Sequence, residues 1–272
     1  MKVDLHIHSN LSDGKYSPST IVQYSAYSHL DIISLTDHDT MTGILEAKKA
    51  IQTWSTVKLL AGVELSTCLD CDEVHILGYG IDECHPAMQQ LLTKAQRRRK
   101  RRVGRILNRL QYAGIRISLE EVKNGYCTES LGRMHIARLL VKRGYVRTIR
   151  EAFDRYLSYD IQTLVPKDFI PPQQAIQIIL EAGGVPVFAH PTIDLFDRHI
   201  DTLIAFGLQG VEIFKVSRSA IEEFYLETVV KDKKLLITGG SDWHGYNQMQ
   251  NLGNFYVDSA RIQPFLEAVN LA

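Results

Sequence analysis

Cysteine is scarce in this 272-residue sequence, which has four, at positions 68, 71, 84 and 127. So few cysteines in a chain of this size do not indicate a disulfide framework. Cys68 and Cys71 have the spacing of a metal knuckle, but Cys84 and Cys127 form no second pair, as a zinc ribbon requires. We therefore expect neither a disulfide framework nor a structural metal at the cysteines.

Long hydrophobic runs are also missing. No apolar stretch approaches the roughly 20 residues that a membrane-spanning helix needs, so we expect no membrane association. The first residue with chemical function is His6, and cleavage of an N-terminal signal peptide would remove it. We therefore expect a cytoplasmic protein, and no sequence feature indicates an obligate protein partner.

The chain has no formal net charge, since 31 Lys and Arg balance 31 Asp and Glu. The charges are nevertheless divided unevenly along it. Residues 85–170 contain 19 basic and 7 acidic residues, whereas the remainder contains 12 basic and 24 acidic residues. A basic middle within an acidic body fits an anionic ligand held between bound cations and arginines. The alternative is a solvated helical surface that is rich in arginine.

Two histidines stand close together near the start of the chain. His6 and His8 lie two residues apart in an alternating apolar and polar run, Val3-Asp4-Leu5-His6-Ile7-His8-Ser9. In a β-strand, residues i and i+2 point to the same side of the sheet. The two side chains are therefore predicted to project together as a pair of imidazole ligands.

Strands and helices alternate in the first and last thirds of the sequence. Ionisable residues follow the strands, and a βα barrel gathers its functional residues at the carboxyl ends of its strands. The pattern gives about seven barrel strands, followed by a short last strand at 255–257. Strands are predicted at 3–8, 31–36, 57–65, 74–79, 185–189, 210–214, 235–238 and 255–257, and helices at 17–29, 42–53, 173–182, 197–206 and 218–230, with another at the C-terminus.

The middle third has a helical pattern and no alternating strand. Apolar residues from Leu92 to Leu110 recur at helical spacing, and 132–142 and 149–157 are predicted as further helices. We therefore predict a barrel domain of residues 1–81 and 171–272. Residues 82–170 are predicted to form an inserted helical subdomain that caps the substrate.

Nine histidines and carboxylates lie on or just past predicted strands or in comparable positions. A single such residue is usually explained by packing or solvent, but nine are not, because buried ionisable groups need partners. Cations between them would supply those partners, and mixed histidine and carboxylate ligation suits zinc, iron or manganese better than calcium or magnesium. The nine residues are His6, His8, Asp13, His38, Glu64, His75, His190, Asp242 and His244.

Several short motifs resemble the PHP (polymerase and histidinol phosphatase) family. They are Asp4-Leu5-His6-Ile7-His8-Ser9, Thr36-Asp37-His38-Asp39, Gly62-Val63-Glu64, Ala189-His190-Pro191 and Ser241-Asp242-Trp243-His244. Their order agrees with that of the family, and the resemblance extends over the whole barrel portion. It implies an α/β fold, a distorted (β/α)7 barrel with the helical subdomain inserted, and a trinuclear metal site that hydrolyses phosphate esters.

The resemblance also implies how the nine side chains share three divalent cations. Manganese is the expected metal, with zinc and iron as alternatives. His6, His8, Glu64 and Asp242 would hold the first cation, Glu64 would bridge to a second completed by His75 and His190, and Asp13, His38 and His244 would hold the third. Asp4, Asp37 and Asp39 lie beside these ligands and are expected to orient the imidazoles, with capping of loops or helices as the alternative.

The residue at position 13 favours one subgroup of the family, since some family members have histidine there. Aspartate at this position, together with the helical insertion, resembles the nucleoside 3′,5′-bisphosphate phosphatases and a related 5′-3′ exoribonuclease. The element Gly132-Arg133-Met134-His135 resembles a Gly-Arg-x-His element of that subgroup, which implies that Arg133 and His135 contact the substrate. Phe153–Leu157 and Val165-Pro166-Lys167 resemble the same insertion.

Two further arginines are predicted to contact the substrate. Arg99 falls on the apolar stripe that Val103 and Ile106 continue, so it needs an anionic partner and is expected to face the cleft. Arg102 is the next candidate. Arginine suits phosphate because its planar fork donates two hydrogen bonds at once. The role of the segment from Lys215 to Arg218 stays open, and three histidines without evident partners are predicted at the surface: His29, His85 and His199.

These inferences favour a metal-dependent phosphoesterase that uses a metal-bridging water and no protein nucleophile. The favoured substrate is a nucleoside 3′,5′-bisphosphate, which would lose its 3′-phosphate to give an AMP-type product. A 5′-3′ exoribonuclease acting on short 5′-phosphorylated RNA is the first alternative, with the RNA continuing along the basic helix. A histidinol-phosphate phosphatase would gain nothing from an arginine-rich insertion. A non-catalytic PHP module would usually have lost its metal ligands.

Overall fold

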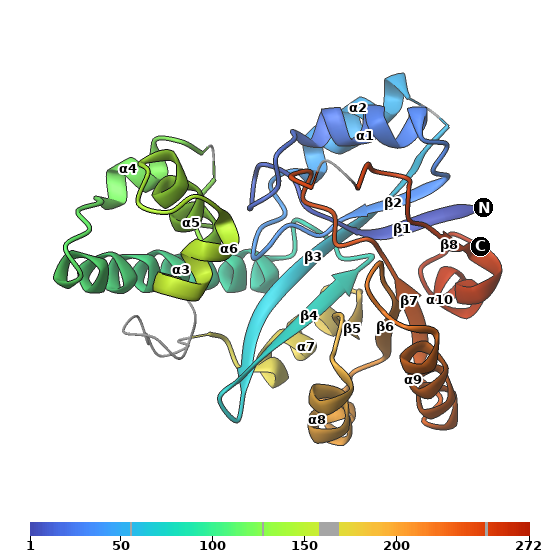
Figure 1. Cartoon of the computed structure of the whole chain (residues 1–272). Helices are drawn as coiled ribbons and strands as arrows, with labels where there is room; N and C mark the ends of the chain where they lie inside the picture. The colour runs from blue at the N-terminus through green and yellow to red at the C-terminus, as the bar shows by residue number, and fades with distance from the viewer. Residues whose placement is uncertain (55, 127, 158–168, 248–249) are drawn as a thin grey trace.

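The structure is a computed structural model that describes residues 1–272 except 55, 127, 158–168 and 248–249 (Figure 1). Its strands are β1 (Lys2–Ile7), β2 (Ile32–Leu35), β3 (Lys58–Leu69), β4 (Asp72–Tyr79), β5 (Val185–Phe188), β6 (Gly210–Phe214), β7 (Leu236–Gly239) and β8 (Val257–Asp258). Its α-helices are α1 (Pro18–Tyr27), α2 (Ile44–Thr53), α3 (Pro86–Tyr112), α4 (Leu119–Lys123), α5 (Arg133–Lys142), α6 (Ile149–Ala152), α7 (Pro172–Glu181), α8 (Ile193–Ala205), α9 (Ala220–Asp232) and α10 (Gln263–Ala268). A short π-helix covers Phe153–Leu157 and a short 3-10 helix covers Ser259–Ile262.

The strands form one barrel-shaped sheet in the order β7-β6-β5-β4-β3-β2-β1-β8. Strands β1 to β3 pair in parallel, as do β5 to β7. Past β7 the chain returns to β1, where the amide of His8 donates to the carbonyl of Trp243 at 2.9 Å and Ile7 forms a bridge with the same residue. The sheet is therefore a nearly closed, distorted barrel, as predicted.

Strand β4 departs from the predicted βα alternation because it runs antiparallel to both of its neighbours. Strand β3 extends to Leu69, beyond the predicted strand at 57–65, and only Asp70 and Cys71 separate it from β4. Both residues have positive φ, 48° and 71°, as a tight hairpin turn requires. A connection this short can join only antiparallel strands, because a parallel crossover needs a dozen or more residues.

The barrel strands are buried on both faces. Every residue of β2, β5 and β6 is buried, and helices α2, α7 and α9 pack against the outside of the sheet (Figure 1). The interior includes ionisable side chains as well as apolar ones, among them Asp4, His6 and Glu64. Such groups are rarely buried without partners. Their partners must therefore come from within the barrel.

The helical insertion, green in Figure 1, lies to one side of the barrel. The first half of α3 packs into the barrel core through Met88 and Leu92, whereas the second half packs through Val103 and Leu110 into a separate hydrophobic cluster. That cluster also includes side chains of α4, α5 and α6. The apolar stripe predicted on α3 is buried as expected. The subdomain boundaries at 81 and 171 stay a prediction.

Two predicted details are wrong. Helix α8 begins at Ile193 rather than near 197, because the Thr192 hydroxyl caps it by accepting from the amide of Leu195 at 3.3 Å. His199 is not a surface residue, since it is 4% exposed and its Nε2 lies 2.8 Å from Asp72 at the start of β4. Across the described ranges, no helix is both long and apolar enough to cross a membrane.

Candidate metal centre

The two histidines at the end of β1 lie side by side in the barrel. Both are 0% exposed, and the Nε2 atoms of His6 and His8 are 3.0 Å apart. The Nδ1 atom of His6 lies 2.9 Å from a carboxylate oxygen of Glu212, so Nδ1 is the donor and Nε2 has a lone pair. Two lone pairs at this separation repel each other unless a proton or a metal cation lies between them. The arrangement fits a pair of metal ligands.

Glu64 of β3 occupies the centre of the cluster and is 1% exposed. Each of its two oxygens faces a different set of imidazoles, as a carboxylate that bridges two cations must. Oε2 lies 3.3 Å from His6 Nε2, 3.2 Å from His8 Nε2 and 3.0 Å from His38 Nδ1, whereas Oε1 lies 2.6 Å from His75 Nδ1 and 2.9 Å from His190 Nε2.

Loops at the carboxyl ends of the strands supply the other predicted ligands. Asp13 Oδ1 lies 3.1 Å from His244 Nε2, and Asp13 Oδ2 lies 4.0 Å from His38 Nε2. Both His190 and Asp242 have positive φ, 33° and 54°. This conformation costs of order 1–3 kcal/mol in a residue other than glycine and persists where the surrounding structure holds it, often at functional sites.

The structure brings all nine predicted ligands together. They fall into four overlapping groups whose ligand atoms lie within 4.8 Å of one another. The groups are His8, Asp13, His38 and His244; His6, Glu64 and His190; His6, His8 and Asp242; and His38, Glu64 and His75. His38 belongs to two groups, so its geometry does not restrict it to the predicted third cation.

Two observations indicate that these residues fit divalent metals. The ligand atoms of His6 and His8 lie 3.0–3.5 Å from each other and from those of Glu64 and Asp242. Four ligands around one cation at 2.0–2.2 Å would lie about 3.3–3.6 Å apart. In addition, the buried Nδ1 of His38 makes no hydrogen bond within the described residues, although it lies near Glu64.

Charges in the cluster oppose the effect of burial on the imidazoles. Burial alone would lower the pKa of His8, but hydrogen bonds to Asp242 and Glu64 raise it to about 10. Burial would likewise lower the pKa of His75, but the charge of Glu64 and its hydrogen bond raise it to about 10. Although burial acts the other way, the surrounding histidines lower the pKa of Glu64 well below its usual range. The negative charge that raises these two imidazole pKa values would also attract metal cations, which would take the place of the protons.

The three aspartates expected to orient imidazoles have another role. In the part of the chain that the structure describes, none of them hydrogen-bonds a ring nitrogen. They accept from backbone amides and hydroxyls instead: Asp4 from Ser241, Asp37 from Ser9, and Asp39 from the amide of Ser66. The expected orienting role is wrong, and the alternative of loop capping describes these contacts.

Glu212 of β6 orients ligands, and sequence analysis missed it. Its Oε1 accepts from His6 Nδ1 at 2.9 Å, and its Oε2 accepts from the amide of His190 at 2.8 Å. Arg218, whose role was open, donates to the carbonyls of Glu212 and Pro191 and so holds this corner of the barrel. The sequence signal was an acidic residue within the apolar run of β6, where a charge needs a partner.

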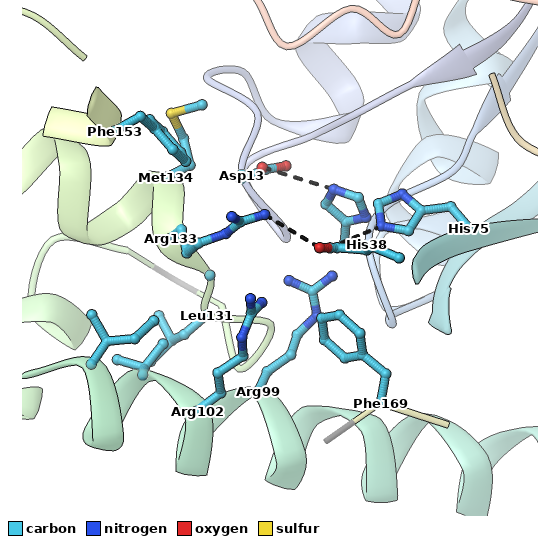
Figure 2. A pocket seen from close by; sticks show the side chains of 14 residues that line it. Asp13, His38, His75, Arg99, Arg102, Leu131, Arg133, Met134, Phe153 and Phe169 are labelled. Carbon is cyan, nitrogen blue, oxygen red and sulfur yellow. Dashed lines mark hydrogen bonds and ion pairs between the residues drawn. The ribbon is translucent and has the colours of Figure 1, made fainter. Parts of the chain in front are cut away.

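A pocket lies between the predicted ligands and the helical insertion (Figure 2). Its volume is about 140 Å³, which is below the roughly 300–1,000 Å³ of typical small-molecule sites. Candidate ligands line one side, and arginines from α3 and α5 line the other. The polar lining residues are Asp13, His38, Glu73, His75, Arg99, Arg102 and Arg133.

Three of the four predicted substrate contacts line this pocket. Arg99 has an anionic partner, as its place on the apolar stripe required: it pairs with Asp39 and donates to the Ser66 hydroxyl at 2.6 Å. Arg102 lies over the ring of Phe169 at 4.9 Å.

Arg133 is 3.4 Å from a carboxylate that was not singled out in the sequence, that of Glu73. The same carboxylate lies 3.3 Å from Nε2 of His75, so it joins an arginine of the insertion to a candidate metal ligand.

His135, the fourth predicted contact, does not line the pocket. It is 0% exposed, its Nδ1 accepts from the amide of Gly132 at 2.9 Å, and its Nε2 donates to the carbonyl of Ser12 at 3.0 Å. Burial lowers its pKa to about 4, so the ring is neutral. The segment Val165-Pro166-Lys167 and Cys127 lie outside the described residues.

Comparisons with known proteins agree with this geometry. A family model described as "PHP domain" matches residues 4–162. The 5′-3′ exoribonuclease Rnm of Salmonella typhimurium is 33% identical over 89% of this chain and 84% of its own length. The 3′,5′-nucleoside bisphosphate phosphatase of Chromobacterium violaceum is 32% identical over 89% of this chain and 87% of its own length. A solved structure from Bifidobacterium adolescentis, of a protein predicted to be a metal-dependent phosphoesterase, has a TM-score of 0.87 and 31% identity over 98% of this chain and 96% of that one.

Proposed function

Because this chain belongs to the PHP domain family and is a metal-dependent phosphoesterase, we propose that it hydrolyses a nucleoside 3′,5′-bisphosphate. Water would replace the 3′-oxygen on phosphorus, which releases inorganic phosphate and leaves an AMP-type nucleotide. The relative from Chromobacterium violaceum carries this activity in its name.

We propose that the nine clustered side chains hold three divalent cations in the sharing that the family resemblance implies. Manganese suits the mixed imidazole and carboxylate donors, with zinc and iron as alternatives. When bound, such cations supply positive charge for phosphate oxygens and a bridging water that is acidic enough to attack phosphorus near neutral pH. The side chains of this chain would position those cations: Glu64 lies among the imidazoles, and Glu212 holds His6 and His190.

The two-sided pocket is the observation that carries the substrate proposal. A phosphate at the ligand side would lie near Asp13, His38 and His75, and arginines face it across the cavity. In Figure 2, Arg99 and Arg102 rise from α3 and Arg133 points in from α5. A substrate with two phosphates can occupy both sides at once. A monophosphate would leave one side without its counter-charge.

The arginines differ in how they are held before substrate arrives. Asp39 and Ser66 fix the guanidinium of Arg99, so little side-chain entropy is lost when it binds phosphate. Arg133 is paired with Glu73, and a phosphate would replace that carboxylate as its anionic partner. We propose that these two arginines and Arg102 bind the phosphate that does not react.

Stepwise cleavage from the 5′ end of short RNA is a second candidate. The relative from Salmonella typhimurium bears the name of a 5′-3′ exoribonuclease. Helix α3 lines the pocket through Arg99 and Arg102 and carries exposed basic side chains on the same turns: Arg97, Lys100 and Arg101. An RNA bound along this helix would make several phosphate contacts, so its affinity would fall steeply as salt rises.

We also propose the division of the chain into a barrel of residues 1–81 and 171–272 and an inserted subdomain of residues 82–170. The separate hydrophobic cluster in the insertion supports this division. A cytoplasmic location, where nucleotides and RNA fragments are produced, belongs to the same proposal.

A hydrolysis panel with Mn²⁺ tests the substrate, with both inorganic phosphate and mononucleotides measured as products. Adenosine 3′,5′-bisphosphate, AMP, histidinol phosphate and a short 5′-phosphorylated RNA are compared at equal concentrations. We expect the bisphosphate to release phosphate fastest and AMP to be a product rather than a substrate. Faster release of mononucleotides from the RNA would favour the second candidate. Equal, slow release from all four would overturn both.

A further inference from the structure

Side chains of the helical insertion donate hydrogen bonds to backbone carbonyls of two barrel loops. One loop, residues 9–14, follows β1 and carries Asp13, and the other, residues 37–40, follows β2 and carries His38. The insertion is therefore joined to the loops that present candidate metal ligands. The contacts are Gln96 to Asp39 O, Thr128 to Leu11 O, Ser130 to His38 O, His135 to Ser12 O and Arg138 to Asp13 O.

We propose that His135 is a positioning residue for Asp13: by holding the carbonyl of Ser12, it keeps the Asp13 carboxylate in place to bind a metal ion. This inference rests on the proposed metal site. It differs from the role that the family resemblance implied, which was direct contact with substrate.

The surroundings of His135 support positioning rather than substrate contact. Its two ring nitrogens are both engaged, one as an acceptor from Gly132 and the other as a donor to Ser12. The ring of Tyr126 packs edge-on against it with centroids 4.4 Å apart. A neutral, fully buried ring with both nitrogens occupied has no atom to offer a phosphate.

The loop around Ser12 is tight enough to transmit a shift. The Ser12 hydroxyl donates to Asp37 at 2.6 Å, and the amide of Gly14 donates to the carbonyl of Ser9 at 2.9 Å. A Cβ atom at Gly14 would overlap the carbonyl of His8, so the chain passes directly over the strand end at this point. Movement of the Ser12 carbonyl therefore displaces Asp13, the next residue.

Two conservative variants separate the roles of the two nitrogens. His135→Gln places an amide N–H near the position of Nε2 and can keep the hydrogen bond to Ser12. His135→Asn places an amide oxygen near the position of Nδ1 and can keep the acceptor for the Gly132 amide, which caps α5. Each variant thus keeps one contact and loses the other, and they serve as controls for one another.

The measurement is Mn²⁺ binding to the full-length, metal-free protein, followed by titration and by metal retained per chain against a chelator. We expect His135→Gln to bind like the wild type. We expect His135→Asn to bind its weakest Mn²⁺ about 10- to 100-fold less tightly, the usual effect of removing a group that orients a ligand. Raising Mn²⁺ should restore kcat in His135→Asn with KM unchanged, whereas loss of a substrate contact would raise KM at every Mn²⁺ concentration.

Three outcomes overturn the inference. Wild-type binding in both variants removes the positioning role, and weaker binding in His135→Gln alone assigns the effect to the helix cap. Equal weakening in both, with a lower unfolding temperature of the metal-free protein, indicates a general structural effect. If the wild type itself binds no Mn²⁺, the proposed metal site fails as well, so the two failures are told apart.

Discussion

Replacing Glu212 with glutamine tests whether one carboxylate sets the position of the proton on His6. The backbone amide of His190 can only donate, so the oxygen of the new side chain must face it. The amide nitrogen then faces Nδ1 of His6, and two donors cannot hydrogen-bond. The imidazole relieves this conflict by moving its proton from Nδ1 to Nε2.

The consequence is large because of what lies around Nε2. This atom is 3.0 Å from Nε2 of His8 and 3.3 Å from Glu64, and a proton there occupies the lone pair that a metal needs. We expect Glu212→Gln to bind Mn²⁺ about 10- to 100-fold less tightly and to lose phosphate release in proportion. The fold should be little affected, since both hydrogen bonds can still form. Glu212→Ala should in addition lower the free energy of unfolding by about 1–3 kcal/mol for each buried donor left without an acceptor.

Three measurements characterise the two variants. Titration with Mn²⁺ gives affinity, thermal unfolding of the metal-free protein gives stability, and ¹⁵N shifts of the histidine rings report which nitrogen of His6 carries the proton. Wild-type Mn²⁺ affinity in Glu212→Gln, with the proton still on Nδ1, would refute the reasoning.

Three further predictions concern ligands, arginines and pH. His8→Ala and Asp242→Ala should abolish phosphate release yet keep the wild-type circular dichroism spectrum, and wild-type turnover in either would contradict the ligand assignment. Arg99→Ala should raise KM for the bisphosphate about 10-fold or more, since a hydrogen bond to a charged group contributes about 1.5–3 kcal/mol, whereas exposed Arg97→Ala should leave KM unchanged. In metal-free protein the pKa values of His8 and His75 are about 10 each, above the ordinary 6.5. The stability that these two groups contribute to the folded protein is therefore complete below pH 6.5 and is lost as pH rises through 10. Calorimetry should therefore show a falling Tm between pH 7 and 10, and a Tm that rises with pH would contradict this.

The structure brings together the nine side chains predicted from the sequence, and two of the signals behind the candidate site are local. Strand alternation alone places His6 and His8 on one side, and the helical stripe alone requires an anionic partner for Arg99, which is Asp39. The direction of β4 was less accessible, because alternation is the same for parallel and antiparallel strands. The two-residue turn at Asp70 and Cys71 settles the direction only once the end of β3 is known.

Burial of polar residues by distant partners could not be predicted from local pattern. Asp72 lies 127 positions from His199, and Glu212 lies 206 positions from His6. No spacing rule joins such pairs, and only the closed barrel brings them together. The same limit explains why His135 was assigned to substrate: its motif was visible, but its contact with Ser12, 123 positions away, was not.

The central place of Glu64 determines when the site forms during folding. Its two oxygens contact imidazoles that lie far apart in the sequence, from His6 to His190. These contacts span most of the sequence, and contacts of high sequence separation form late because loop closure must come first. A chain whose barrel has not closed therefore lacks the site altogether. We therefore expect no hydrolytic activity from a chain whose barrel has not closed.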